Sequence, residues 1–214
     1  MSKKLLLLGA GGHCKSIIDT LSSSNEYSEI GIIEKEGTST QTVLGIPVIG
    51  FDDDLQELYG RGFTHAFVSL GSIGDTGARR RLSSLLSSIG YSVPNIIDKS
   101  AHVSADCELG KGIFIGKNVV VNAGVTIGDY SIINTSATIE HDCKIGQFVH
   151  ISTGTVLCGS VTIGNDSHIG ANSVIRQQLE IGSNVMIGIG SVSLQNIPDQ
   201  STAYGNPCKV VSPR

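Results

Sequence analysis

The feature that most constrains the fold is an aliphatic residue that recurs every six positions through the second half of the chain. It occurs fifteen times between residues 103 and 187, without an insertion. A helix would need a period of about 3.6 residues and a half-buried strand a period of about 2, so neither fits. Fixed self-similarity of this kind is typical of a solenoid. The repeated residues are Val103, Leu109, Ile115, Val121, Ile127, Ile133, Ile139, Ile145, Ile151, Leu157, Ile163, Ile169, Ile175, Ile181 and Ile187.

The residues between these aliphatic positions indicate how each six-residue step folds. Four places after the aliphatic residue stands a side chain no larger than valine in thirteen of the fifteen steps, the exceptions being Ile113 and Leu179. Glycine directly follows the aliphatic residue in eight steps. Such a step suits a short strand and a tight corner, and three steps of this kind close a triangular coil. Stacked inward, each aliphatic side chain contributes roughly 1.5–3 kcal/mol of burial. We expect the glycines that follow the aliphatic residues to occupy corners whose backbone angles a Cβ would penalise. The pattern predicts a parallel β-helix of about five coils.

The first half of the chain alternates apolar runs with helical patterns, which is typical of a small parallel sheet of Rossmann-like type. The pattern predicts strands at 5–8, 30–33, 43–49, 65–70 and 91–97, and helices at 16–21, 52–59 and 75–89. We therefore expect an α/β domain over residues 1–98. The β-helix domain, with a C-terminal tail, is expected over 99–214.

Composition narrows the possible partners and compartment. The 214-residue chain has a formal net charge of −4, and its one basic run is Arg79–Arg81, so nucleic acid is not an expected partner. The apolar run Leu5–Leu8 is too short for a signal peptide, and no stretch is long enough to cross a membrane. Five scattered cysteines are expected to be reduced thiols. We expect a cytoplasmic protein.

Several motifs make the whole chain resemble one family. They are GAGGHCKSIID at 9–19, NIIDKSAHVS at 95–104, the hexapeptides at 103–192, IEHD at 139–142 and NIPDQSTAYGNPCKVV at 196–211. They resemble sialic acid O-acetyltransferases and nucleotide-amino-sugar N-acetyltransferases, which are bacterial hexapeptide-repeat acyltransferases. The resemblance implies a left-handed β-helix, a homotrimer with intersubunit active sites, and a sugar or nucleotide-sugar site in the N-terminal domain. It also implies acetyl-CoA bound in the groove between neighbouring β-helices.

His141 is the candidate catalytic base. It takes the third place of the Ile139 step, an outward position, and imidazole can accept a proton near neutral pH. Glu140 or Asp142 could orient the ring, and the resemblance favours Asp142. One coil further, Gly159 would leave room for a thioester, and its N–H could bind the developing oxyanion. The alternative is that His141 is an ordinary surface residue.

The resemblance also assigns residues to acetyl-CoA. It places His150 near the acetyl end, and Ala171 and Ile189 along the pantetheine, although glycine is more common in the family where Ile189 stands. His168 takes the same place as His150 one coil later and is expected to be a stacked surface histidine. Cys143 takes an inward place, so we do not expect it to act as a nucleophile.

A zinc site is the alternative use of the β-helix histidines, as in γ-class carbonic anhydrases, where two subunits share the metal. His150 follows His141 by one and a half steps of the repeat, and His168 follows His150 by three. These spacings do not indicate one converging site, so no metal is expected.

A second candidate site lies near the N-terminus, where Gly9–His13 follows a strand and opens a helix. Free N–H groups cradle phosphate in such a turn. Cys14 replaces the third glycine of a dinucleotide fingerprint, so NAD is not expected. Glu34, at the end of the next strand, could accept hydrogen bonds from ribose or base. By resemblance, the sugar-nucleotide site is lined by Gly11, Gly12, His13, Glu34 and Gly71. The alternative is that these glycines only make a tight turn.

Together these features predict an acetyltransferase of bacterial surface glycan biosynthesis. The acetyl group would pass from acetyl-CoA to the amine of a nucleotide-linked 4-amino sugar, with His141 as general base. One alternative is O-acetylation of sialic acid or a related acid sugar. Another is a sugar-nucleotide-binding scaffold without catalysis.

Overall fold

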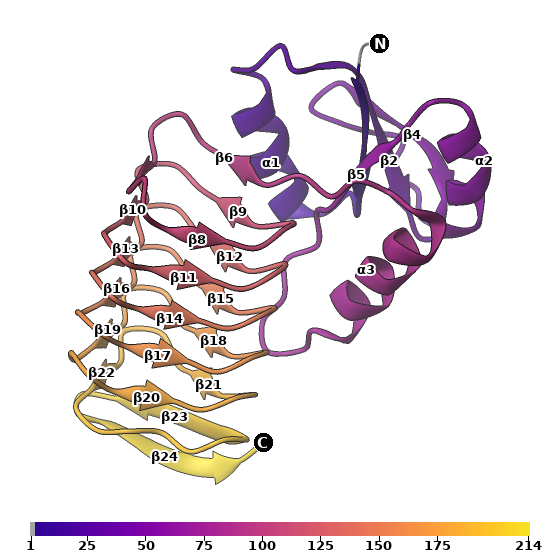
Figure 1. The fold of residues 1–214 in the computed structure, drawn as a ribbon. Coiled ribbons are helices and arrows are strands. Elements are labelled where there is room, and N and C mark those ends of the chain that lie inside the picture. Colours follow the sequence, from indigo (N-terminus) through magenta and orange to yellow (C-terminus); the bar gives the residue numbers. More distant parts are fainter. Residues whose placement is uncertain (1–2) are drawn as a thin grey trace. The chain divides into compact units, whose positions relative to one another are not determined.

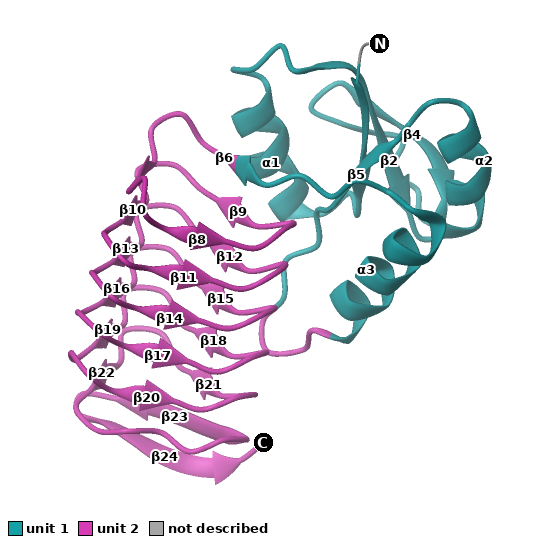
Figure 2. Cartoon of the chain, in the orientation of Figure 1, with its two compact units in different colours: residues 1–72, 77–96 teal, residues 73–76, 97–214 magenta. Residues whose placement is uncertain are grey.

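The computed structural model describes residues 3–214, which form two compact units (Figure 2). The first unit comprises residues 3–72 together with residues 77–96. The second comprises residues 97–214 and the short segment 73–76, which lies between two elements of the first unit in sequence.

The first unit is an α/β fold around a five-stranded sheet with strand order β3-β4-β2-β1-β5 (Figure 1). β1, β2, β4 and β5 run parallel, and β3 pairs antiparallel with β4. The strands are β1 (Lys3–Leu8), β2 (Tyr27–Glu34), β3 (Thr42–Val43), β4 (Ile46–Phe51) and β5 (His65–Val68). The helices are α1 (Gly12–Leu21), η1 (Asp52–Asp54), α2 (Leu55–Gly60) and α3 (Gly77–Ile89).

The centre of this sheet explains the apolar run near the N-terminus. Leu5, Leu6, Leu7 and Leu8 are at most 1% exposed, because β1 lies between β2 and β5 and is covered on both faces. A parallel strand in that position is apolar at every residue, without alternation.

Three expected elements of the first unit differ in the structure. The strand expected at 43–49 is a hairpin, because Leu44 and Gly45 take positive φ values of 47° and 82°. The helix expected at 52–59 begins with the 3-10 turn η1. The strand expected at 91–97 is reduced to a bridge between Ser92 and His65 and the short strand β6 (Ile96–Ile97). An apolar run alone does not tell a strand from an extended connection.

The second unit is a left-handed parallel β-helix, as predicted, with three faces built from two-residue strands and, at the C-terminal end, a hairpin of longer strands (Figure 1). Each strand pairs with the strand three steps along the chain, which lies on the same face of the next coil, as Val121 does with Ile139. The first face contains β7 (His102–Val103), β10 (Val120–Val121), β13 (Thr138–Ile139), β16 (Val156–Leu157), β19 (Val174–Ile175) and β22 (Val192–Ser193). The second contains β8 (Glu108–Leu109), β11 (Thr126–Ile127), β14 (Lys144–Ile145), β17 (Thr162–Ile163) and β20 (Glu180–Ile181). The third contains β6, β9 (Phe114–Ile115), β12 (Ile132–Ile133), β15 (His150–Ile151), β18 (His168–Ile169), β21 (Met186–Ile187), β23 (Ser201–Gly205) and β24 (Cys208–Pro213).

The expected role of the repeat glycines is wrong. From the Leu109 step onward, the corner residue with a positive φ is the fourth of each step, such as Gly124 at 71° and Asp142 at 60°, and not the glycine that follows the aliphatic residue. On the second face, where every step has glycine in the second place, the reason is different. A Cβ at Gly128 would lie 2.7 Å from the backbone nitrogen of Gln147 in the next coil. Close approach of successive coils therefore excludes a side chain there.

The interior of the β-helix is formed by the aliphatic residues and the small residues four places later. Ile139, Ile151 and Ile169 are fully buried. The hairpin of β23 and β24 extends the third face beyond β21, and its Ala203 and Cys208 join the same core. No helix within residues 3–214 is long and apolar enough to cross a membrane.

Candidate functional site

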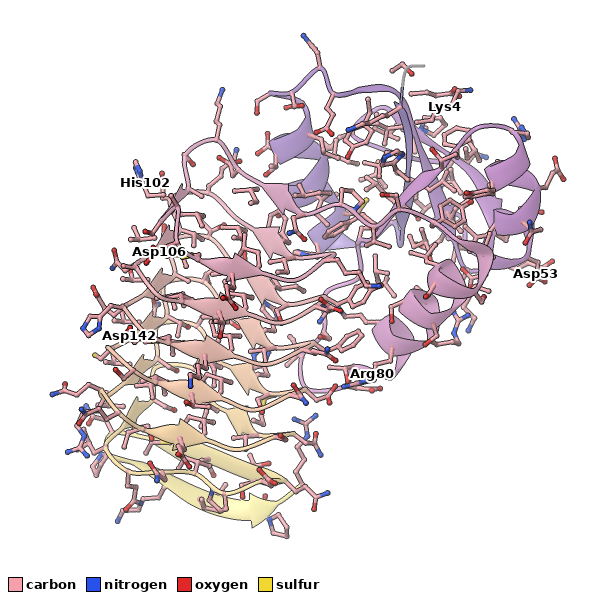
Figure 3. All side chains as sticks on the ribbon, viewed as in Figure 1. Lys4, Asp53, Arg80, His102, Asp106 and Asp142 are labelled. Atoms are coloured by element: carbon pink, nitrogen blue, oxygen red, sulfur yellow. The ribbon has the colours of Figure 1, made fainter. Side chains whose placement is uncertain are left out.

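His141 lies at a corner of the β-helix, in the turn between β13 on the first face and β14 on the second. Its Nδ1 is 2.7 Å from Oδ2 of Asp142, and the two side chains are 60% and 65% exposed. Asp142 is itself the corner residue with a positive φ, a conformation that aspartate tolerates better than most residues. Asp142 lies at the outer edge of the β-helix (Figure 3). Of the two candidate carboxylates, it is Asp142 that bonds the imidazole.

The hydrogen bond to Asp142 fixes the protonation pattern of the neutral ring. An ionised carboxylate only accepts hydrogen bonds, so Nδ1 carries the proton and donates it to Asp142. The lone pair of the neutral imidazole is then on Nε2. His141 therefore presents a proton acceptor at the ring edge away from Asp142.

Gly159, one coil further along the same corner, lies directly against that ring edge. A Cβ on Gly159 would be 2.6 Å from Nε2 of His141 and 2.7 Å from Cε1. The Gly159 carbonyl accepts the Gln178 N–H at 3.0 Å, whereas its own N–H donates to no group of the described chain. Glycine at this position leaves Nε2 uncovered and places its own backbone N–H at the same corner, one coil further along.

An open pocket of about 400 Å³ surrounds this corner, lined by His141, Gly159, Ser160, Gln177 and Gln178. Sequence analysis identified the first two and missed the other three. The repeat itself could have found them, because Gln177 and Gln178 take the places of Gly159 and Ser160 one coil later.

The other residues assigned to acetyl-CoA lie elsewhere on the β-helix. His150 begins β15 on the third face, where its Nε2 is 3.2 Å from Nδ2 of Asn134. Ala171 and Ile189 occupy turns that follow the third face, and Ile189 is 80% exposed. None of the three lines the His141 pocket within one chain.

His168 forms the predicted column with His150, but it is not a surface residue. The two residues are paired in register on β15 and β18, and their rings meet edge to face at 4.9 Å. His168 is 7% exposed, and its Nε2 is 3.3 Å from Oγ of Ser152.

Cys143 has the inward orientation expected of it. Its side chain is fully buried, and its Sγ donates to the Cys158 carbonyl at 3.2 Å. Burial raises the pKa of the Cys143 thiol to about 11. A thiol with so little thiolate at neutral pH is a poor nucleophile.

The second candidate site lies in the first unit, at the carboxyl ends of β1, β2 and β5. The chain leaves β1 for β2 on one side and later crosses to β5 on the other, so the strand order reverses at β1. Ligands of open α/β sheets bind at such a switch point. The chain segment after β1 contains Gly11, Gly12 and His13. Glu34 is the last residue of β2, and Gly71 follows β5, so the fold brings all five residues to one edge of the sheet.

The turn after β1 is held in place by the carboxylate of Glu34. Its Oε2 accepts the Ala10 N–H at 2.5 Å, and its Oε1 accepts the Lys35 N–H at 2.8 Å. A Cβ at Gly71 would lie 3.4 Å from Cβ of His13, so these two residues are also in contact range. Glu34 thus orders the glycine turn, and each of its oxygens keeps a lone pair for a ligand.

The glycines at the start of α1 leave space in front of the helix. Neither Gly11 nor Gly12 would bring a Cβ within 4 Å of any described neighbouring atom. The first turn of α1 contains no acidic residue, and Gly11 provides no side-chain cap in the described structure. The positive end of the helix dipole therefore stays open to an anion.

A metal centre has no candidate in the part of the chain that the structure describes. Within residues 3–214, no three His, Cys, Asp or Glu side chains are grouped so as to hold an ion.

Two family models match the chain. The PglD N-terminal domain matches residues 4–86, and the bacterial transferase hexapeptide (six repeats) matches residues 106–141 and 142–177. No curated protein sequence matches the chain.

Solved structures resemble both units together. Perosamine N-acetyltransferase from Caulobacter crescentus, a histidine-to-asparagine mutant in complex with CoA and GDP-perosamine, is 32% identical with a TM-score of 0.92. The match covers 99% of this chain and 98% of that one. The acetyltransferase domain of PglB from Neisseria gonorrhoeae, in complex with acetyl coenzyme A, is 36% identical with a TM-score of 0.91. That match covers 99% of this chain and all of the other.

Proposed function

Since the chain belongs to the hexapeptide-repeat acetyltransferases with a PglD-type N-terminal domain, we propose that it acetylates the amino group of a nucleotide-linked amino sugar. Acetyl-CoA is the donor, and a 4-amino sugar of bacterial surface glycan biosynthesis is the acceptor class. The observation that carries the proposal is the His141–Asp142 pair, whose free ring nitrogen faces Gly159 in an open pocket.

His141 acts as the general base. The sugar amine attacks the thioester carbonyl, and Nε2 of His141 takes a proton from the amine nitrogen as the new C–N bond forms. Asp142 holds the ring through Nδ1 and stabilises the imidazolium. The C–S bond then breaks, and the imidazolium returns its proton to the departing thiolate, so His141 is regenerated. Positioned base catalysis of this kind contributes about 10²- to 10⁴-fold in rate.

Gly159 supplies the room and the donor for the oxyanion. Its N–H has no partner within residues 3–214, and the missing side chain leaves space beside Nε2 of His141. A preorganised backbone N–H that meets developing negative charge stabilises the transition state. Acetyl-CoA itself supplies the activated acyl carbon.

A homotrimer reconciles the separate places of the acetyl-CoA residues. His141 and Gly159 stand at the corner between the first and second faces, opposite the third face that holds His150. Ala171 and Ile189 stand at another corner. Residues so placed can serve one thioester and its pantetheine only when neighbouring copies bring different corners together. Ile189, an exposed aliphatic residue, suits such a groove.

The nucleotide sugar binds in the first unit, at Gly11, Gly12, His13, Glu34 and Gly71. Support comes from the switch point, the open N-terminus of α1 and the free lone pairs of Glu34. The expected ligand atoms are phosphate oxygens at the glycines and a ribose or base donor at Glu34.

A panel of acceptors tests this function. Purified protein is incubated with acetyl-CoA and, separately, with GDP- and UDP-linked 4-amino sugars, with sialic acid, and with no acceptor, and products are identified by mass spectrometry. We expect an N-acetylated nucleotide sugar. Acetylation of sialic acid alone would replace the acceptor class, and no transfer to any acceptor would favour a binding scaffold.

A further inference from the structure

Gly124 lies directly beneath the carboxylate that orients His141. It takes the place of Asp142 one coil earlier on the same corner, and a Cβ on Gly124 would be 2.7 Å from Oδ1 of Asp142. The backbone of Gly124 has a φ of 71°. The next-nearest atoms of Asp142, Cγ and the backbone nitrogen, would be 3.7 Å away. Only the end of the carboxylate would meet the added group.

The backbone around Gly124 is held from both sides and cannot easily retreat. The Gly124 N–H donates to Oδ2 of Asp106 at 3.1 Å, and Oδ1 of Asp106 accepts the Ser104 hydroxyl at 2.6 Å. The carbonyl of Ala123 accepts the Asp142 N–H at 3.0 Å. The hydrogen bond from Ser104 is the main cause that lowers the pKa of Asp106, which keeps this carboxylate an ionised acceptor.

An exposed carboxylate moves more easily than this braced backbone. A methyl group at position 124 would therefore turn the Asp142 carboxylate instead of displacing the coil. Because Oδ2 bonds Nδ1 of His141, such a rotation breaks the contact that sets the tautomer of the ring.

We infer that Gly124 is a positioning residue, whose missing side chain leaves the space that the Asp142 carboxylate needs in order to hold His141. The inference rests on the proposed function, in which His141 is the base. It adds a residue that touches neither substrate nor imidazole and that acts through Asp142.

Gly154 offers a matched control. It takes the same place in its own step, has a φ of 67°, and a Cβ there would meet Oδ1 of Asn172 in the next coil. Gly154→Ala thus carries the same backbone strain and the same kind of side-chain displacement. Within one chain it lies at the corner that follows the third face and not at the His141 corner, so the His141 tautomer is its control readout.

The experiment compares Gly124→Ala, Gly154→Ala and the unaltered protein by the imidazole nitrogen NMR signals of His141, steady-state kinetics and thermal unfolding. We expect the Nδ1–H tautomer of His141 in the unaltered protein and in Gly154→Ala. In Gly124→Ala the population of the Nε2–H tautomer of His141 should rise. The kcat should fall by about tenfold, with little change in KM for acetyl-CoA. The two variants should lose similar thermal stability.

Gly124→Asn is the second variant, because Asn118, Asn172 and Asn184 already adopt this corner conformation with φ values of 53–55°. It should fold and show the same tautomer change. Unchanged tautomer and kcat in both Gly124 variants, or an equal change of the His141 tautomer in Gly154→Ala, would overturn the inference. If the tautomer shifts but His141→Ala keeps its turnover, the positioning role stands and the assignment of the base fails.

Discussion

The two units use glycine in opposite ways at their candidate sites. In the β-helix, Gly159 and Gly124 are glycine because a side chain of the same chain occupies the space beside them. In the α/β unit, Gly11 and Gly12 face open space, with no described atom within 4 Å of a Cβ position. The space beside the β-helix glycines is therefore filled by the protein's own side chains, whereas the space beside Gly11 and Gly12 is open, as the proposed nucleotide-sugar site requires. Identical Gly→Ala changes should act on different kinetic constants.

Among the changes that leave His141 itself in place, the largest effect is expected at Gly159. In Gly159→Ala the new methyl group would lie 2.6 Å from Nε2 of His141 and must push the ring aside. Misplacement of a catalytic group by about 1 Å can reduce kcat about 100-fold. The exposed ring can move, so the midpoint of thermal unfolding should hardly change. Steady-state kinetics beside a melting curve check this, and a variant within twofold of the unaltered kcat would show that the ring is not used there.

Two substitutions of Asp142 distinguish the role of its charge from the role of its corner conformation, and their effect on kcat is expected to be intermediate. Asp142→Asn keeps a residue that tolerates a positive φ but removes the negative charge that stabilises the imidazolium. Because the pair is exposed, we expect roughly a tenfold loss of kcat and little loss of stability. Asp142→Ala should lose the same activity and also about 1 kcal/mol of unfolding free energy, from the strained corner. Equal stability of the two variants in denaturant titrations would argue against corner strain.

A substitution of Gly12 tests the open glycine turn of the α/β unit. Gly12→Ala puts a methyl group into the open space before α1, where the nucleotide phosphates are proposed to bind. We expect KM for the nucleotide sugar to rise several-fold, while kcat and KM for acetyl-CoA stay constant. Gly60→Ala is the control, since Gly60 also faces open space but lies at the C-terminal end of α2. A rise in KM in both variants, or in neither, would remove phosphate binding from this helix terminus.

The smallest effect concerns two of the buried thiols, Cys14 in the first unit and Cys143 in the second. Burial raises the pKa of both Cys14 and Cys143 to about 11, so at pH 8 only about one thiol in a thousand is ionised. Reaction with iodoacetamide should be slow at both and should accelerate as the pH rises toward 11. The partly exposed Cys107 and Cys158 should react before these two. Peptide mass spectrometry after timed alkylation reports each site, and early modification of Cys143 would contradict its inward place.

The sequence predicts the β-helix far more closely than the α/β unit, and the reason is geometric. Because three equal steps always make one coil, His141 and Gly159 are neighbours before any coordinates are known. In the α/β unit no fixed spacing along the sequence predicts the contacts. The hydrogen bond between Ala10 and Glu34 and the contact between His13 and Gly71 join residues at sequence separations that follow no common period. The apolar run at 91–97 could not reveal that only Ser92 and the pair Ile96–Ile97 would make strand contacts.

Even within the β-helix, composition misled in one respect. Glycine is frequent directly after the aliphatic residue, which suggested a strained corner, yet the positive φ belongs to the fourth place, where Asp142, Gln178 and Ser160 also occur. Spacing predicts which residues stack, but it does not reveal which backbone angle each position takes. Nor can one chain show how corners of different copies meet, so the places of His150, Ala171 and Ile189 gain a shared purpose only in the proposed trimer.

The role of His141 as general base is tested most directly by the turnover of His141→Ala with acetyl-CoA and a nucleotide-linked 4-amino sugar. His102→Ala is measured alongside, as an exposed histidine on the first face of the same β-helix. We predict a loss of at least about 100-fold in kcat for His141→Ala, an unchanged melting midpoint, and normal turnover for His102→Ala. Turnover by His141→Ala equal to that of the unaltered protein would contradict this role.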